Sequence, residues 1–192
     1  FVKNEGQVDL KIQFYEKGSS QPIAFTKEAV LFQLESGTVR LFPVGMNPQA
    51  TLSAENPQPG RVNYLIGNKD KWKVNLPTYG RVAYKEVYPN IDMAFYGNNG
   101  ALEYDVGVHP GADPKTVRFG YEGIASLKQG SEGELTVLLQ NGGSLFQKKP
   151  VLYQTIHGKQ VSVAGAFRVY NDPKGKAWTY GFDVAAYDKR YP

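Results

Sequence analysis

Residues 91–108 read IDMAFYGNNGALEYDVGV, and this stretch decides the fold class. Apolar side chains occupy every second position before its middle, and the same alternation resumes after it. A strand points successive side chains to opposite faces, so each half has one face to bury. Between the halves stands Asn98-Asn99-Gly100, whose residue types tolerate the positive φ angles of tight turns. The stretch therefore predicts an antiparallel hairpin.

The same alternation recurs along the whole chain. Turn-forming residues separate the alternating runs at 141–143, 157–159 and 172–175, and each predicts a further hairpin. No stretch of a dozen residues carries the 3.6-residue period of a helix, and the proline-rich segments 57–60 and 109–114 are predicted to be loops. The other alternating apolar sets are Val8/Leu10/Ile12/Phe14, Val30/Phe32/Leu34, Leu135/Val137/Leu139, Val161/Val163, Phe167/Val169 and Phe182/Val184.

Many short strands joined by hairpins predict an all-β fold, an antiparallel β-sandwich in a single domain over residues 1–192. Two variants stay open. One is a large curved sheet of the supersandwich kind, and the other is a pair of subdomains with a boundary near residues 56–60. A chain of 192 residues with 41% hydrophobic content supplies a core for either arrangement. We see no internal repeat, which argues against a complete propeller.

Charge and cysteine content exclude several classes of function. The net charge is +4, but Lys and Arg are interleaved with Asp and Glu, so no nucleic-acid partner is predicted. The absence of cysteine excludes disulfides, thiolate metal sites and a cysteine nucleophile. No apolar run approaches the ~20 residues of a membrane span. The sequence begins at Phe1 without a signal peptide, so we expect that an upstream segment has been removed.

A longer stretch, residues 60–97, reads GRVNYLIGNKDKWKVNLPTYGRVAYKEVYPNIDMAFYG. It resembles the N-terminal domain of bacterial secreted proteins that carry SBBP repeats, which are β-propeller-type repeats. The resemblance implies an extracytoplasmic protein, secreted or on the cell surface, in which this domain precedes downstream repeat modules. It brings no catalytic residues, and the family pattern continues past residue 192 into a further apolar strand. Other matching pieces are FVKNEGQ (1–7), LEYDVGVHPGADPKTVRFGYEG (102–123), KKPVLYQ (148–154) and FDVAAYDKRYP (182–192).

Glu103 and Asp105 are the strongest pair of candidate catalytic carboxylates. They stand two residues apart on a predicted strand and so point to one face, and Asp92 can reach the same face from the hairpin partner. Paired carboxylates at suitable separations carry out glycoside hydrolysis. The simpler interpretation, which we favour, is a polar outer face whose carboxylates pair with Lys or Arg across the strands.

Aromatic residues are in surplus, with 13 tyrosines in the chain. Trp72, Tyr79 and Tyr96 are the candidate ligand-binding residues, because flat aromatic faces with polar neighbours suit sugar rings and peptides. Tyrosine also simply favours half-exposed strand positions, so core packing is the competing interpretation. The two histidines, His109 and His157, adjoin turn residues without metal-ligand spacing, so neither a metal nor a cofactor is predicted.

Three functions follow, in order of preference. The first is a non-catalytic extracellular module, a structural or adhesive head that contacts its partner through an aromatic sheet face or a sheet edge. The second is a carbohydrate-binding domain for a cell-surface polysaccharide. The third is a carbohydrate-active enzyme, which requires a concave pocket holding a carboxyl group with a shifted pKa.

Overall fold

The computed structural model describes residues 1–18, 22–171 and 178–192. Its regular structure is strand, interrupted within those residues by two single-turn 3-10 helices, η1 (Lys69–Lys71) and η2 (Pro114–Thr116). The all-β prediction is confirmed. The strands are β1 (Val2–Lys3), β2 (Ile12–Tyr15), β3 (Ile23–Thr26), β4 (Val30–Leu34), β5 (Gly37–Pro43), β6 (Thr51–Tyr64), β7 (Lys73–Tyr88), β8 (Ile91–Asn98), β9 (Ala101–Val108), β10 (Arg118–Glu122), β11 (Ile124–Gln129), β12 (Leu135–Leu139), β13 (Ser144–Gln147), β14 (Leu152–Ile156), β15 (Lys159–Val163), β16 (Gly165–Asn171) and β17 (Trp178–Val184).

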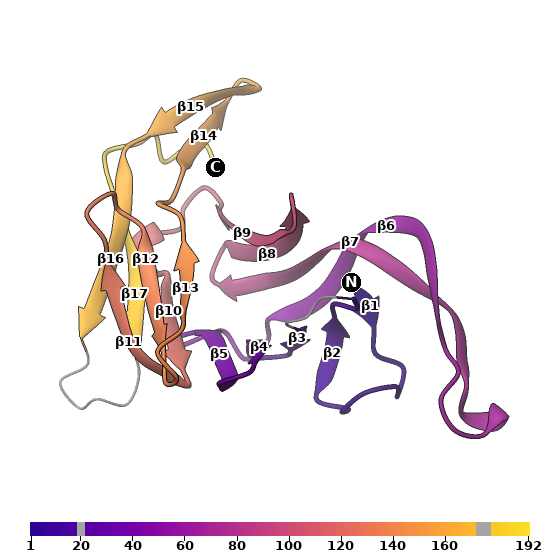
Figure 1. Ribbon diagram of the computed structural model, residues 1–192. Coiled ribbons are helices and arrows are strands. Elements are labelled where there is room, and N and C mark those ends of the chain that lie inside the picture. The colour runs from indigo at the N-terminus through magenta and orange to yellow at the C-terminus, as the bar shows by residue number, and fades with distance from the viewer. Residues whose placement is uncertain (19–21, 172–177) are drawn as a thin grey trace.

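Among the described residues, twelve strands form one curved antiparallel sheet (Figure 1). Its order is β16-β17-β10-β5-β4-β3-β2-β1-β7-β8-β9, and β6 pairs with β7 outside this path. Two smaller sheets, β11-β12-β13 and β14-β15, accompany it. Strand β11 contacts β16 and β17, so the first small sheet forms a second layer over one end of the large one. The sandwich prediction thus takes the form of a large curved sheet with smaller sheets packed on it.

The predicted hairpins form where turn chemistry permits them. Asn98 pairs with Ala101 around Asn99 and Gly100, which have φ angles of 49° and 80°. The turn at His157 and Gly158 is built in the same way, with φ angles of 49° and 76°. Positive φ is cheap for glycine and tolerable for Asn and His, so these residue types determine where the chain reverses. The predicted turn at residues 172–175 lies outside the described residues.

The prediction of a loop at residues 57–60 is wrong, because β6 runs through them as a strand paired with β7. Proline lacks an N–H group, yet it is tolerated on an edge strand or at a bulge, where no ladder donor is needed. Both conditions hold here: β6 pairs only with β7 among the described strands, and its register shifts between Gln58 and Arg61. The segment 109–114 does lie outside the strands and leads into η2.

The core lies inside the curve of the large sheet. Its centre is a series of aromatic rings in mutual contact, with centroid separations of 5.4 Å for Phe25–Phe95, 5.7 Å for Phe95–Tyr104 and 5.9 Å for Tyr104–Phe119. Full burial of one such side chain contributes about 1.5–3 kcal/mol. These rings come from β3, β8, β9 and β10, so the core holds the two ends of the sheet against one another.

One hairpin leaves this core. The far end of β6–β7 projects away from the rest of the molecule and carries η1 at its tip (Figure 1). Its base packs on a separate small cluster of buried residues that includes Val2, Tyr15 and Leu76. Among the described residues, no helix combines the length and apolar character that crossing a membrane requires.

Candidate functional site

The largest hollow described in the molecule is a cleft of about 880 Å³ between two extended segments. Every residue from 101 to 109, which is β9 and the residue after it, lines one side. Every residue from 146 to 155 lines the other, running from the end of β13 into β14. Two continuous stretches of chain therefore bound one slot; the first is strand β9, and the second joins β13 to β14 through residues 148–151. A hollow of this size falls in the usual range for ligand sites.

Strand β9 is the free end of the large sheet, since it pairs only with β8 among the described strands. In an antiparallel pair, every second residue turns its N–H and C=O groups away from its partner. Ladder bonding begins at the Asn98–Ala101 pair that closes the turn, so the outward-turned backbone groups of β9 belong to Leu102, Tyr104, Val106 and Val108. These groups face the slot, and this makes β9 an edge to which a further strand can be added.

A network of side-chain hydrogen bonds joins β9 to the opposite side at the floor of the cleft. The Tyr104 hydroxyl donates to Oε1 of Gln147 at 3.0 Å and lies 2.9 Å from the Tyr180 hydroxyl. Nε2 of Gln147 donates to the Tyr121 hydroxyl. Burial raises the pKa of all three phenols, which therefore stay protonated at neutral pH. The floor is consequently neutral, polar and fixed in position.

The opposite wall presents apolar side chains that the protein itself leaves uncovered. Phe146 is 70% exposed and Val151 82% exposed, and Tyr153 is also exposed. Lys148 and Lys149 lie between them and are exposed as well. This wall therefore offers apolar surface and positive charge to any chain that lies against β9.

A buried glutamine fixes the base of this wall. Nε2 of Gln154 donates to the carbonyl oxygens of Asp188 and Tyr191 at 2.7 and 3.1 Å, and its Oε1 accepts from Asp188 N–H at 2.9 Å. The N–H of Thr155 adds a bond to the carbonyl of Pro192 at 3.1 Å. Residues 188–192 are thereby held against β14 and close one end of the cleft.

The three candidate catalytic carboxylates do share one face, as the sequence predicts. The register pairs Tyr96 with Glu103 and Ala94 with Asp105, and Asp92 occupies the same face two residues before Ala94. Glu103 accepts a hydrogen bond from Nδ2 of Asn98 at 3.1 Å. Their environment is one of pairing across strands, which is the simpler of the two interpretations.

Asp105 is occupied by two neighbours. Its Oδ1 accepts from the Tyr96 hydroxyl at 2.8 Å, and its Oδ2 lies 3.8 Å from Nη1 of Arg81. Burial together with the hydrogen bond to Asp105 raises the pKa of Tyr96 to about 12. Arg81 in turn reaches Glu55 at 3.2 Å, so charge alternates across β6, β7 and β9.

Asp92 makes more polar contacts than either of the other two carboxylates. It lies 3.2 Å from Nζ of Lys85 and 3.4 Å from Nε2 of His109, and it accepts a hydrogen bond from the Glu86 N–H at 2.8 Å. Burial works to raise its pKa, but the bonds from Glu86, His109 and Lys85 outweigh it and hold that pKa below the usual value. A general acid needs a raised pKa, so Asp92 is unsuited to that role. The described residues contain no group of three or more His, Cys, Asp or Glu side chains placed to hold a metal ion.

The candidate ligand-binding aromatics lie in three separate places. Tyr96 lines the cleft, Tyr79 lines a smaller pocket, and Trp72 stands at the tip of the projecting hairpin. They do not form one platform for a ligand. The sequence analysis did not identify Gln147, Phe146 or Tyr153 as site residues, because their positions depend on how the two ends of the sheet meet. The one signal for Tyr153 and Gln154 was the distinctive stretch KKPVLYQ, to which no site role was assigned.

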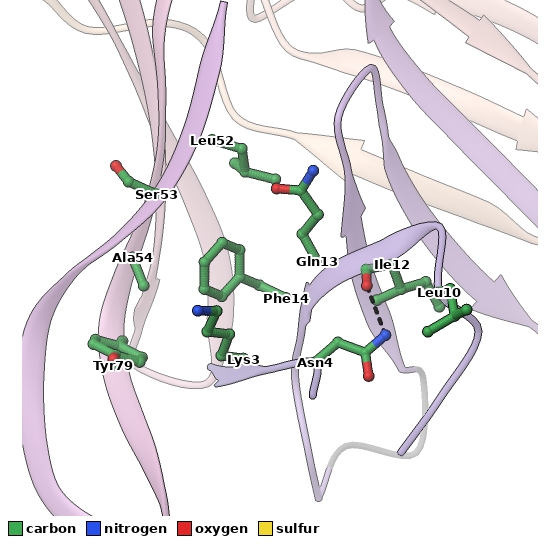
Figure 2. A pocket seen from close by; sticks show the side chains of 10 residues that line it. All are labelled: Lys3, Asn4, Leu10, Ile12, Gln13, Phe14, Leu52, Ser53, Ala54 and Tyr79. Carbon is green, nitrogen blue, oxygen red and sulfur yellow. Dashed lines mark hydrogen bonds between the residues drawn. The ribbon is translucent and has the colours of Figure 1, made fainter. Parts of the chain in front are cut away.

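The smaller pocket has a volume of about 450 Å³ and lies between β1–β2 and β6–β7 (Figure 2). Phe14, Leu52 and Tyr79 give it apolar walls, and Phe14 meets Tyr79 edge-on at 6.5 Å. Asn4 folds the loop beside it, donating from Nδ2 to the Ile12 carbonyl at 2.7 Å. Asn4 therefore has a structural role that accounts for its place in the opening FVKNEGQ.

Comparison with known families gives one match. The family model described as "Domain of unknown function (DUF7948)" covers residues 1–192. No curated protein and no solved structure matches the chain.

Proposed function

The chain belongs to DUF7948, a family of domains of unknown function, and we propose from its geometry that it is a non-catalytic binding module. Its ligand is an extended polypeptide that lies in the cleft and pairs with β9 as an added strand. This is the adhesive form of the function that the sequence favours. It places the partner contact at a sheet edge.

The observation that carries this proposal is the continuity of the two walls. Residues 101–109 and 146–155 each line the cleft without a break, so the slot is as long as a strand. Eight residues of β9 span about 27 Å at the rise of an antiparallel strand. Strand addition obtains affinity from main-chain hydrogen bonds and specificity from alternate side chains. Phe146 and Val151, opposite the edge, supply the apolar surface for those alternate side chains.

A polysaccharide is the second candidate for the same cleft. Exposed Phe146 and Tyr153 offer aromatic faces, and Tyr96 and Glu103 line the other wall with polar groups. Sugar rings stack on such faces and bond to such groups. We rank it second because a free strand edge offers a row of backbone donors and acceptors in the register that a peptide needs.

The compartment belongs to the same proposal. We assign the domain to the outside of the cytoplasm, as a secreted or cell-surface module that precedes SBBP repeats. Its support is the resemblance of segments 1–7, 60–97 and 102–123 to that group of proteins. In this setting the partner segment comes from downstream repeat modules or from another surface protein.

The test is a binding selection followed by a matched pair of variants. A phage-displayed library of linear peptides is selected on the purified domain, and the enriched peptides are synthesised and titrated. Val106→Pro removes an N–H group from the free edge of β9 without removing a bond to β8, while Val106→Ala removes the same packing and keeps the N–H. We expect Val106→Pro to weaken binding about tenfold relative to Val106→Ala, the effect of losing one good hydrogen bond.

Two results contradict the proposal. Enriched peptides that bind both variants equally would place the ligand away from the β9 edge. Saturable binding to a panel of soluble polysaccharides, lost in Phe146→Ala and Tyr153→Ala but not in Val106→Pro, would establish the carbohydrate function instead.

A further inference from the structure

The tip of the β6–β7 hairpin is an apolar apex on the most projecting part of the molecule (Figure 1). Leu65 is 56% exposed and Ile66 73% exposed, and Trp72 and Val74 are exposed beside them. These four side chains lie within ten residues of sequence, in and around η1. Neither of the two cavities described above includes any of them. The hairpin therefore ends in a projecting tip with exposed apolar side chains, outside both of these cavities.

Positive charge is concentrated in the sequence of this tip and the adjoining stem. Residues 61–74 contain Arg61, Lys69, Lys71 and Lys73 and a single carboxylate, Asp70, which gives the tip a net charge of +3. The chain as a whole has a net charge of +4 over 192 residues, so most of its excess charge is concentrated in these fourteen. Lysine stems lie along apolar surface while their amino groups reach a polar boundary.

Two hydrogen bonds link residues of the tip and of the stem below it. Nε1 of Trp72 donates to the carbonyl of Gly67 at 3.2 Å, which ties the indole across η1. Gly67 has a φ angle of 73°, which glycine adopts easily. Further down the hairpin, Asn63 Oδ1 accepts from the Asn75 N–H at 2.7 Å and joins β6 to β7.

The part of the hairpin directly below its tip is anchored in the domain. Tyr64 meets Tyr15 edge-on at 6.2 Å, and the amino group of Lys17 lies 4.2 Å from the Tyr64 ring centroid. Leu76 is buried in the same cluster, with Val62 packed against it. The tip is thus presented on a stem that the domain fixes, at a distance from the cleft.

From these observations we propose that the hairpin tip docks on the surface of a bilayer that contains anionic phospholipids. Leu65, Ile66 and Trp72 enter the boundary between headgroups and acyl chains, and the lysines bind the phosphates around them. Trp is suited to this boundary, and basic residues beside an apolar face are typical of segments that lie in it. A peptide or nucleic-acid strand needs a groove or platform along which to lie, whereas a projecting apex fits a soft phase. This contact is independent of the cleft and its peptide.

The experiment is vesicle co-sedimentation of the purified domain. The vesicles are phosphatidylcholine alone and phosphatidylcholine with phosphatidylserine at a 7:3 ratio, each in low and high salt. We expect binding to the anionic vesicles that weakens with salt. Lys69→Gln with Lys71→Gln should weaken it about 25-fold, since each lysine near such a surface contributes about fivefold. Leu65→Ser with Ile66→Ser should weaken it at least as much, because it removes the inserted apolar surface.

A control comes from β15, away from both the tip and the lining of the cleft. Val161→Ser changes an exposed apolar residue there and should leave vesicle binding unchanged. In a Trp178→Phe background, Trp72 is the single tryptophan, and its emission should shift to shorter wavelength when anionic vesicles are added. Far-ultraviolet circular dichroism confirms that each variant is folded.

Several outcomes would overturn the inference. One is no binding to anionic vesicles at low salt; another is binding that survives Leu65→Ser with Ile66→Ser. Binding of soluble polyglutamate or RNA with an affinity equal to that for vesicles, and unaffected by loss of the two apolar side chains, would assign the tip to an acidic polymer. An unchanged Trp72 emission on sedimenting vesicles would show that another surface makes the contact.

Discussion

The β8–β9 and β6–β7 hairpins are built from the same kind of sequence and end in opposite environments. In β8–β9, the alternating apolar side chains face the core, and the outer edge borders a cleft. In β6–β7, the half nearer the domain does the same, and Val62, Tyr64 and Leu76 of the distal half pack in the separate small cluster. The apolar residues at the tip itself are exposed. Alternation therefore specifies a strand and its two faces. It does not specify what covers them.

High pH should produce the largest effect on the stability of the fold, because it ionises tyrosine side chains that are buried in the core. Burial raises the pKa of Tyr88 to about 12 and raises those of Tyr84, Tyr104, Tyr121 and Tyr180 as well, from an ordinary value of 10. The folded state keeps these protons while the unfolded state loses them. Stability should be fully present below pH 10 and fall steeply as the pH rises toward 12. Thermal unfolding measured from pH 7 to 12 checks this, and a constant Tm above pH 10 would contradict it.

The next largest effect should be a difference between the two hairpins in how far truncation of an apolar side chain lowers the free energy of unfolding. Phe95→Ala in β8 removes a fully buried ring and should lower the free energy of unfolding by about 3–5 kcal/mol. Ile66→Ala at the tip of β6–β7 should change it by less than about 0.5 kcal/mol, because that side chain is exposed. Urea denaturation of both variants provides the comparison. A large effect at Ile66 would mean that the tip packs on the domain.

Removal of the Tyr104 hydroxyl should show how much the buried hydrogen-bond network contributes to holding β9 in place. Tyr104→Phe removes the hydrogen bonds of this hydroxyl to Gln147 Oε1 and to the Tyr180 hydroxyl at the floor of the cleft and should cost about 1–3 kcal/mol. Tyr96→Phe, on the outer face of the neighbouring strand β8, removes only a bond to Asp105 at the surface and should cost less. Equal effects in urea denaturation would mean that the buried network does not hold β9 in place.

The smallest effect belongs to the charges on the outer face of the same strands. Asp92→Asn separates Lys85 and His109 from their carboxylate and should cost less than about 1 kcal/mol at neutral pH, as exposed ion pairs do. Because the pKa of Asp92 lies below its ordinary value of 3.8, its contribution is present above that pH and is lost as the pH falls through the folded-state pKa. Comparison of urea unfolding at pH 7 and pH 3 checks the sign: the difference between wild type and variant should shrink in acid.

The sequence alone predicted local structure better than it predicted the site. Alternation and the Asn-Gly turn predicted the β8–β9 hairpin and the shared face of Asp92, Glu103 and Asp105, because both depend on neighbours in the chain. The cleft exists because β9 and residues 146–155 lie opposite one another, and no pattern within either segment of the sequence predicts that arrangement. Pro57 and Pro59 led to the wrong prediction of a loop for a related reason. Proline interrupts a strand only where its missing N–H would have to bond a neighbouring strand, and an edge strand has no neighbour on its free side.

The hydrogen bonds of Gln154 have a mechanical consequence. The Gln154 side chain donates hydrogen bonds to the backbone of both Asp188 and Tyr191, and the N–H of Thr155, on the same strand, donates to the carbonyl of Pro192. A pull on residues 188–192 therefore loads their bonds to β14 before it loads β17, the strand to which these residues are covalently joined. Under tension, residues 188–192 should detach from β14 before the core gives way. A single-molecule stretching record of the domain, pulled from this tail, should show a short first extension that Gln154→Ala removes.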